Sequence, residues 1–526
     1  MKLFKLRGGV HPEGRKASSA DAAIRALPLP SHLYVPLQQH VGAPAKPVVQ
    51  VGEQVLAGQL IGAGQGNISA PVHAPTSGRV VAIGDHPAPH PSGLPAATVT
   101  IEPDGESRWL DYDIPSDPFA LAPDDIAARV GAAGIVGLGG ATFPSAVKLK
   151  LSRKSGVDTL IINGGECEPY LTCDDRIMRE RAVEIVTGIR LIQHAVGASR
   201  ALVGIEDNKP AALAAMRAAA AGTEVHIQAV PAMYAMGWDK QMIQVLLGRE
   251  VPAEGRSADI GVLVHNVATA WAVQQTICLG RPLVSRIVTV SGGAVAQPGN
   301  LEVPIGTPVQ ALFDACGGFT TKPARLVLGG PMMGHQLTHT SVPVVKGSSG
   351  VLALTQAEIG LTRPAPCIRC STCVRACPVG LLPLEMAARI RADDLDAAVT
   401  LGLKDCIGCG SCSYVCPSSI PLVHYFNYAK SELMAQARSK LKQEATKKLA
   451  DERIARMERI AREREEAAAA RKAAKAAKKG LPVSPDSSGS TAVILGEVVA
   501  EDKPGGRTQP KKQPRSKRTG PPPKSK

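Results

Sequence analysis

The sequence is poor in aromatic residues and has no long apolar run. Phe, Trp and Tyr make up 3% of the 526 residues, and no stretch approaches the roughly 18–20 apolar residues that span a bilayer. Residues 1–16 carry charge but no apolar core, which argues against a secretory signal. We therefore expect a cytoplasmic protein whose attachment to any membrane is peripheral.

A disulfide framework is also not expected, although the chain has 12 cysteines. A reducing cytoplasm disfavours disulfides, and a chain of this length does not need them for stability. Eight cysteines fall in two quartets and four are scattered. We expect Cys278 and Cys316 to be small core residues. We expect Cys167 and Cys173 to be buried thiols, with a third metal site as the alternative.

The net charge of +14 is concentrated towards the C-terminus. Residues 437–526 contain 24 Lys and Arg against 11 Asp and Glu, whereas residues 1–436 contain 36 against 35. The basic character therefore bears on the partners of the tail and not on an active site. The Ala/Glu/Lys/Arg-rich residues 429–480 predict a charged helix with little apolar stripe, and residues 481–526 predict a disordered basic tail.

The chain is too long for one hydrophobic core, so several domains are expected. Short alternating runs between Gly-rich turns predict a β-rich domain over residues 1–110, which resembles the barrel-sandwich (lipoyl-like) fold. Carrier domains of that fold present a lysine at a hairpin tip, but the equivalent segment "GAGQGNISAPV" contains none. A structural or docking domain is therefore the better interpretation.

Residues 117–285 alternate between short β-rich runs and helical runs. The segments "VDTLIING", "RALVGIED" and "TEVHIQAV" are separated by stretches with helical periodicity, which predicts a Rossmann-like α/β domain with a mostly parallel sheet. The run from Arg176 to Ala198 is predicted to be one helix. Residues 286–345 return to strands and turns and predict a β-grasp domain, and residues 360–428 contain the two quartets.

The two quartets carry the strongest chemical signal. Each has the pattern C-x2-C-x2-C-x3-C-P. Zinc, the main alternative, usually takes two separated C-x2-C pairs. Three cysteines at successive three-residue intervals instead surround one face of an iron–sulfur cluster, and the fourth cysteine ligates the other cluster. The pattern therefore predicts a bacterial-type ferredoxin domain with two [4Fe–4S] clusters. One is held by Cys367, Cys370, Cys373 and Cys416, and the other by Cys377, Cys406, Cys409 and Cys412.

Two adjacent clusters conduct electrons but need a donor site upstream. The candidate is "GIVGLGGATFPSAVKLK", residues 134–150. Its glycines allow a phosphate or flavin to approach the backbone closely, Pro144 suits the start of the next helix, and Lys148 supplies a counter-charge. Because the loop follows a helical stretch, it does not match the dinucleotide fingerprint. A plain turn is the alternative.

The same loop resembles a known flavin site. "GLGGATFPSAVKL" is similar to the FMN-binding loop of the NADH-oxidising (51 kDa-type) subunit of respiratory complex I. "INGGECEPYLTCDDR" resembles the acidic loop that follows it, and "LVHNVATAWAV" a later segment of that family. Together with the barrel-sandwich, β-grasp and ferredoxin segments, the order over residues 1–430 resembles the RnfC-type subunit of the ion-translocating Rnf/Rsx electron transport complex.

This resemblance implies noncovalent FMN that is reduced by NADH. Gly137, Gly139, Gly140 and Lys148 would contact the flavin phosphate and ring. The catalytic candidates Glu166 and Glu168 would line the flavin and nicotinamide pocket with Asn163. Asn266 and Thr269 would close the phosphate side, and "YAMGWDKQ" would contribute Gly237 and Asp239. Trp238 departs from the small residue usual there. A solvated acidic loop is the alternative for Glu166, Glu168, Asp174 and Asp175.

The implied function is electron entry into an ion-translocating complex. Electrons would pass from NADH through FMN and two [4Fe–4S] clusters to a ferredoxin-type acceptor or a redox regulator. The partners would be membrane-embedded and ferredoxin-like subunits, at the cytoplasmic face of the bacterial inner membrane. One alternative is a soluble NADH dehydrogenase module of a hydrogenase or formate dehydrogenase. Another is an adaptor whose basic tail binds a membrane surface or nucleic acid, although the absence of interleaved aromatics argues against base stacking.

Overall fold

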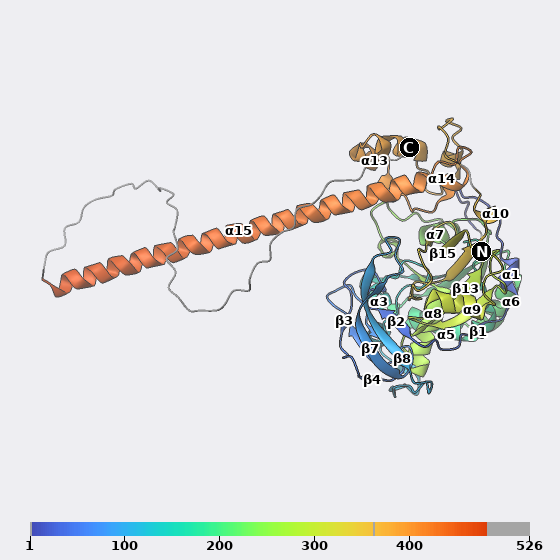
Figure 1. Ribbon diagram of the computed structural model, residues 1–526, viewed down its shortest axis with the longest axis horizontal. Helices are drawn as coiled ribbons and strands as arrows, with labels where there is room; N and C mark the ends of the chain where they lie inside the picture. The colour runs from blue at the N-terminus through green and yellow to red at the C-terminus, as the bar shows by residue number, and fades with distance from the viewer. Residues whose placement is uncertain (1–2, 361–362, 481–526) are drawn as a thin grey trace, which may run out of the picture. The chain divides into compact units, whose positions relative to one another are not determined.

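The computed structural model describes residues 3–360 and 363–480. The chain divides into two compact units, residues 1–439 and 440–526. All strands of the described residues lie in the first unit (Figure 1).

The N-terminal strands form two small antiparallel sheets. One has the order β2-β8-β7-β4 and the other β3-β5-β6. The long β7–β8 pair is blue in Figure 1. Alternating apolar side chains of these strands, such as Val80, Val99 and Ile101, are fully buried, which confirms the predicted strand–turn–strand units. The strands are β2 (Leu33–Pro36), β3 (Lys46–Pro47), β4 (Gln54–Val55), β5 (Leu60–Ala63), β6 (Val72–His73), β7 (Gly78–Pro87) and β8 (Pro95–Pro103).

The middle of the chain forms a four-stranded parallel sheet with the order β11-β10-β9-β12. Helices cover both faces, because Leu160 and Ile162 of β9 pack into one core while Ile161 packs against Met242 of α7. The predicted strand–helix alternation is confirmed. The elements are η1 (Pro118–Ala120), α2 (Pro123–Ala132), α3 (Ser145–Lys154), β9 (Thr159–Gly164), α4 (Cys173–Glu180), α5 (Ala182–Val196), β10 (Arg200–Glu206), α6 (Pro210–Ala220), β11 (Val225–Val230), α7 (Asp239–Leu247), η2 (Ser257–Ile260), β12 (Val262–Asn266) and α8 (Val267–Leu279).

The prediction of one helix from Arg176 to Ala198 was wrong. The segment forms α4 and α5, which meet at Arg181 in a non-helical conformation (φ −130°, ψ 30°). Arg176 and Arg179 of α4 both donate to the carbonyl of Ala20, whereas α5 packs its apolar face into the main core. Ile177 and Met178 of α4 belong to the same core, so the contacts with Ala20 are what distinguish α4 from α5. Helical periodicity does not reveal such contacts.

The predicted β-grasp region forms a six-stranded mixed sheet with the order β1-β14-β13-β17-β15-β16. It extends beyond the predicted residues 286–345, because β17 pairs with both β13 and β15, and β1 pairs with β14. Its elements are α1 (Ala17–Ala20), β1 (Arg25–Ala26), β13 (Ser285–Ser291), β14 (Gly299–Pro304), α9 (Val309–Ala315), β15 (Arg325–Leu328), β16 (His335–Gln336), β17 (Gly350–Leu354) and α10 (Gln356–Ile359).

The cysteine-rich region consists of short helices around a small core. Its centre contains Met386, Leu403 and Phe426, which are almost fully buried. The helices are α11 (Thr372–Ala376), α12 (Pro383–Arg391), α13 (Leu395–Thr400), η3 (Leu403–Asp405) and α14 (Ser411–Tyr414).

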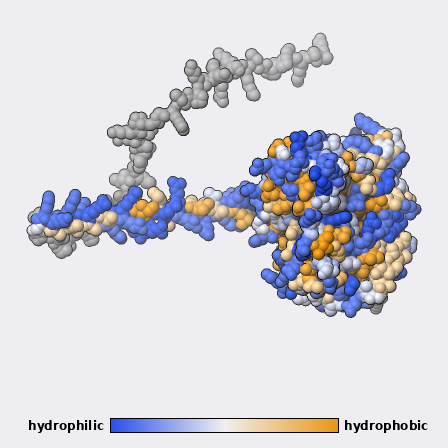
Figure 2. Space-filling model, turned by 90° about the horizontal axis from the view of Figure 1, so that it is seen from below, coloured by the Kyte–Doolittle hydropathy of each residue, from blue (hydrophilic) through white to orange (hydrophobic). Residues whose placement is uncertain are grey.

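The predicted charged helix is present as α15 (Leu422–Lys478). Beyond residue 439 its large apolar side chains Leu441, Leu449 and Ile454 are exposed, and hydrophilic side chains cover most of the face seen in Figure 2. None of the helices among the described residues has the length and apolar character of a membrane span. The tail predicted for residues 481–526 lies outside the described residues.

Candidate functional site

The glycine-rich loop connects α2 to α3 and presents free backbone donors. The amide of Gly137 donates to the carbonyl of Phe143 at 2.9 Å, which closes the loop. Within the part of the chain that the structure describes, the amides of Gly139 and Gly140 have no hydrogen-bond partner. Both residues are exposed, and the space beside Gly140 is open. Free amides beside open space suit an anionic group such as a phosphate.

The loop is fixed to β12 and α8 by two of the predicted residues. The Leu138 amide donates to the Thr269 hydroxyl at 2.9 Å, so this fully buried threonine holds the middle of the loop. Asn266 caps α8 by accepting from the Ala268 amide and donates to Asp174 at 2.7 Å. The backbone of Gly139 lies close to the Asn266 side chain. Thr269 and Asn266 therefore contact the loop itself and help to fix its backbone conformation.

Lys148 and Asp239 provide charge beside the loop. The Lys148 ammonium donates to the carbonyl of Val264 at 3.0 Å. Burial lowers the pKa of Lys148, and the negative charge of Asp239 opposes that shift. An anion bound beside the Lys148 ammonium would gain a charge partner.

The sheet topology brings two predicted asparagines to one place. The chain proceeds from β9 outward to β11 and then crosses to β12 on the other side of β9, so the strand order reverses between β9 and β12. Asn266 is the last residue of β12 and Asn163 the last but one of β9, and the two are directly paired in register. Ligands of open α/β sheets bind at the carboxyl ends of strands beside such a reversal.

Asn163 also ties the acidic loop to the predicted segment around Gly237. Its side chain donates to the Gly237 carbonyl at 2.8 Å and accepts from the Gly165 amide at 2.9 Å. The Gly237 amide lies 3.2 Å from the Cys167 sulfur. Burial raises the pKa of Cys167 to about 12, so the thiol stays neutral and fills a structural position.

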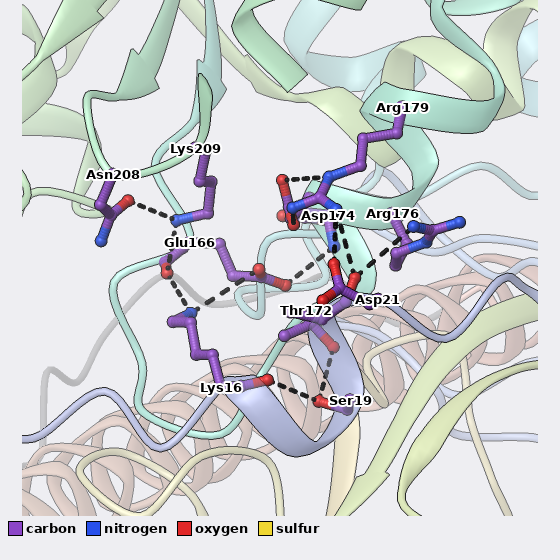
Figure 3. A network of polar contacts seen from close by, with 12 residues as sticks. Lys16, Ser19, Asp21, Glu166, Thr172, Asp174, Arg176, Arg179, Asn208 and Lys209 are labelled. Carbon is purple, nitrogen blue, oxygen red and sulfur yellow. Dashed lines mark hydrogen bonds and ion pairs between the residues drawn. The ribbon is translucent and has the colours of Figure 1, made fainter. Parts of the chain in front are cut away.

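Glu166 is the centre of the polar network in Figure 3. One carboxylate oxygen accepts from the Asp174 amide at 2.8 Å, and the other lies 3.7 Å from the Lys16 ammonium. Lys16 and Lys209 both donate to the Glu166 carbonyl, at 2.7 and 3.3 Å. Two lysines from distant segments therefore fix the backbone of the acidic loop.

Glu168 binds a turn of the six-stranded sheet region. Its two carboxylate oxygens accept from the amides of Met332 and Met333 at 3.0 and 2.8 Å. Burial raises the pKa of Glu168 to about 7, although these two hydrogen bonds and Lys16 act in the opposite direction. This glutamate therefore joins the acidic loop to the turn after β15 and titrates near neutral pH.

The alternative of a solvated acidic loop does not fit these contacts. Asp175 is buried and pairs with Arg179. Desolvation raises the pKa of Asp174 to about 6, and its carboxylate accepts from Asn266. Ligand atoms of Glu166, Cys173 and Asp174 lie within 4.8 Å of one another, but hydrogen bonds inside the protein already engage all three. The loop is thus part of the folded interior.

The structure separates the eight quartet cysteines into two groups. One cavity, of about 20 Å³, is lined by Cys377, Cys406, Cys409 and Cys412. A second cavity, of about 260 Å³, is lined by Cys367, Cys370, Cys373 and Cys416. Each group takes three cysteines from one quartet and one from the other. Each group has the same members as one of the two ligand sets that the spacing predicts, and the ligation itself stays a prediction.

The sulfur atoms are spread more widely than a zinc site requires. A tetrahedral zinc ion with Zn–S bonds of about 2.3 Å places its sulfurs about 3.8 Å apart. Among the described residues, no three of these cysteines bring their sulfurs within 4.8 Å of one another. The wider arrangement fits the cuboidal cluster predicted from the spacing.

The group that contains Cys377 lies beside the acidic loop. The buried Tyr234 hydroxyl donates to the Cys409 carbonyl at 2.6 Å, and the Gly9 amide donates to the Ala376 carbonyl at 3.0 Å. Cys409 packs with Tyr234, Cys167 and Met332 in one apolar cluster. The acidic loop and this cysteine group therefore share one interface.

Sequence reasoning missed several of these residues. Lys209 follows β10 at the same sheet edge as Asn163, so its place after a strand was a usable signal. Lys16 reaches the site from a remote segment, and no local pattern marks it. Tyr234 begins the predicted segment "YAMGWDKQ", but that pattern did not show its contact with Cys409.

Four family models match successive parts of the chain. They are the RnfC barrel sandwich hybrid domain (residues 4–106), the Nuo51 FMN-binding domain (130–275), the SLBB domain (287–336) and the 4Fe-4S dicluster domain (366–420). The expected cofactors, FMN and [4Fe–4S] clusters, are those of the matched domains. The free loop amides and the two cysteine groups fit them.

Curated relatives cover most of the chain. The RnfC-type subunit of the ion-translocating oxidoreductase complex of Rhodobacter capsulatus is 52% identical over 82% of this chain and 84% of its own length. The protein of the same name from Pseudomonas aeruginosa is 46% identical over 87% of this chain and 59% of its own length. A solved NAD+-reducing [NiFe]-hydrogenase in the H2-reduced state has a TM-score of 0.44 and 21% identity, covering 62% of this chain and 63% of that chain. The chain belongs to the RnfC family of subunits of ion-translocating oxidoreductase complexes.

Proposed function

We propose that this chain is the NADH-oxidising, electron-entry subunit of its complex. When bound, FMN accepts two electrons from a nicotinamide and releases them one at a time. The amides of Gly139 and Gly140, with Lys148, would hold the flavin phosphate. Asn163, Glu166 and Glu168 would line the pocket for the flavin and nicotinamide rings.

The observation that carries the proposal is the interface between the acidic loop and one cysteine group. Tyr234 bonds to the Cys409 backbone, and Cys167 packs against both. Electrons would therefore pass first to the cluster of Cys377, Cys406, Cys409 and Cys412. They would leave through the other cluster, whose Cys367 and Cys370 are exposed.

The acceptor would be a ferredoxin-like subunit of the same complex, and membrane-embedded subunits would couple the transfer to ion translocation. The chain would lie at the cytoplasmic face of the membrane as a peripheral subunit. Its family name supports this arrangement, because relatives are named as subunits of an ion-translocating oxidoreductase.

The test is anaerobic reconstitution of the full chain, followed by metal and flavin analysis and EPR spectroscopy. We expect about eight iron atoms, from two four-iron clusters, and one FMN per chain, with both cofactors reduced by NADH. A protein that binds zinc and no flavin would overturn the proposal. Full activity in a complex that never fractionates with membranes would instead favour a soluble NADH dehydrogenase module.

A further inference from the structure

A buried lysine from outside the flavin domain holds the glycine-rich loop. Lys346 precedes β17 and has 1% of its surface exposed. Its ammonium donates to the carbonyls of Gly134 and Pro71, both at 2.7 Å. Its own amide donates to Gln39 at 3.0 Å. Lys346 therefore joins the N-terminal sandwich, the glycine-rich loop and the six-stranded sheet region at one point.

This lysine has no counter-ion in the folded protein. Within residues 3–360 and 363–480, Lys346 makes no ion pair with a carboxylate. The titratable groups whose pKa its charge lowers are His40 and His73, both buried. Burying an ammonium group without a carboxylate is costly, so a lysine here calls for a role that an apolar side chain could not fill.

The contact with Gly134 is tight and specific. Gly134 has a φ of 67°, and a Cβ there would lie 2.4 Å from the Pro71 carbonyl oxygen and 2.7 Å from the Lys346 nitrogen. Gly134 begins the loop, and its carbonyl must accept a bond because the residue is buried. Lys346 supplies that donor.

A second buried cation acts on the middle of the same loop. Arg286 of β13 has 3% of its surface exposed and donates to the carbonyls of Leu138 and Ser348, both at 3.2 Å. With the Leu138 amide bound to Thr269, both backbone groups of that residue are engaged. Gly139 and Gly140, whose amides are free, are the next two residues of the chain.

We infer that Lys346 is a positioning residue for the flavin loop, which it holds through the Gly134 carbonyl in the shape that leaves the Gly139 and Gly140 amides free to bind phosphate. The binding shape of the loop is thus imposed from a neighbouring domain. This inference rests on the proposed function in one respect, namely that residues 134–140 are the flavin loop.

The test compares Lys346→Met, which keeps the length but removes the donors, with wild type in the anaerobically reconstituted full chain. FMN is added to flavin-depleted protein and followed by the quenching of its fluorescence. We expect the Kd of Lys346→Met to rise about tenfold, equivalent to about 1.4 kcal/mol. Lys346→Gln retains two N–H donors and should recover part of that loss. Lys322→Met, at an exposed lysine of the same region, should leave the Kd unchanged.

A second measurement keeps positioning separate from flavin binding. In the absence of FMN, hydrogen exchange of residues 134–142 should quicken in Lys346→Met, while exchange in β10 stays the same. Equal Kd values and equal exchange in wild type and Lys346→Met would overturn the inference. If wild type bound no FMN, the proposed function would fail, while the exchange result would still decide the role of Lys346. If Lys346→Met lost its clusters, the same two measurements on Lys346→Gln, namely the Kd for FMN and the hydrogen exchange of residues 134–142, would decide the role of Lys346.

Discussion

The two cysteine quartets share one spacing but lie in different surroundings. Cys409 and Cys412 are buried. Their cavity has a volume of about 20 Å³, and Cys409 packs against Cys167 of the acidic loop. Cys367 and Cys370 are exposed and line a cavity of about 260 Å³. The spacing decides what each group can bind, whereas the surroundings decide where it stands in an electron path.

The two quartets share a backbone conformation but differ in the residues that adopt it. Two and four residues after its first cysteine, each quartet adopts a left-handed conformation, at Arg369 and Ser371 (φ 55° and 60°) and at Gly408 and Gly410 (φ 67° and 79°). A Cβ at Gly410 would lie 3.0 Å from the Met332 carbonyl oxygen. The packed quartet therefore needs a glycine where the exposed quartet carries a serine.

The largest effect should come from removing a cysteine that ligates the cluster of the other quartet. Cys377→Ala lies in the first motif but should remove the cluster built mainly by residues 406–412. We expect iron to fall from about eight to about four atoms per chain, with loss of the EPR signal of the shielded cluster. Cys367→Ala should remove the other signal. If Cys377→Ala abolished the same signal as Cys367→Ala, the assignment of ligands would be wrong.

A change at Glu168 should alter the pH dependence of stability on the packed side. Its folded pKa of about 7 exceeds the unfolded value of about 4.3, so the folded state binds more protons between these values. The contribution is complete below the unfolded pKa and is lost as the pH rises through 7. Relative to Glu168→Gln, wild type should lose on the order of 2 kcal/mol from pH 5 to 8, less than the full shift because Glu168 is partly exposed.

Thermal unfolding of the two proteins at a series of pH values measures this difference. Glu358→Gln is a suitable control, because hydrogen bonds lower the pKa of Glu358. Its contribution is lost only as the pH falls below the unfolded value of about 4.3, so the curves of Glu358→Gln and wild type should stay parallel from pH 5 to 8. Parallel curves for wild type and Glu168→Gln would show that Glu168 does not titrate in this range.

Tyr234→Phe should lower the stability of the protein near the packed quartet by a smaller amount. The change leaves the buried Cys409 carbonyl without its donor and should lower stability by about 1–2 kcal/mol, while both clusters remain. The exposed Tyr414 lies in the same segment as Cys409, so Tyr414→Phe should leave the unfolding midpoint unchanged. Equal midpoints in all three proteins would argue against the Tyr234 contact as a stabilising one.

The smallest effect should follow removal of residues 440–526. This segment carries most of the net charge but none of the candidate site residues. Flavin content, both EPR signals and NADH oxidation with an artificial acceptor should therefore stay within experimental error of wild type. A loss of either cluster would show that the tail region contributes to the cofactor sites.

Local patterns predicted those features whose causes are local. The spacing of the eight cysteines predicted the 4Fe-4S dicluster domain, because a loop wrapping a cluster must place sulfurs at short regular intervals. The alternation along residues 157–230 gave the parallel sheet, because its strands are buried on both faces.

Contacts between remote segments were not predictable in this way. Lys346 and Arg286 approach the glycine-rich loop from a different domain, and Tyr234 meets Cys409 across 175 positions of sequence. The break at Arg181 was likewise not predicted. Helical and strand periodicity report burial along one element but not which other element covers it.

The N-terminal segment contacts parts of the fold that are synthesised much later. Gly9 bonds to the backbone of Ala376, about 370 residues later, and Lys16 bonds to Glu166 and Leu171. At about 5–20 residues per second, the ribosome needs roughly 20–70 s to make the intervening chain. The contact of Gly9 with Ala376 therefore cannot form until several hundred further residues have been made, whereas the contacts of Lys16 need the chain only as far as Leu171.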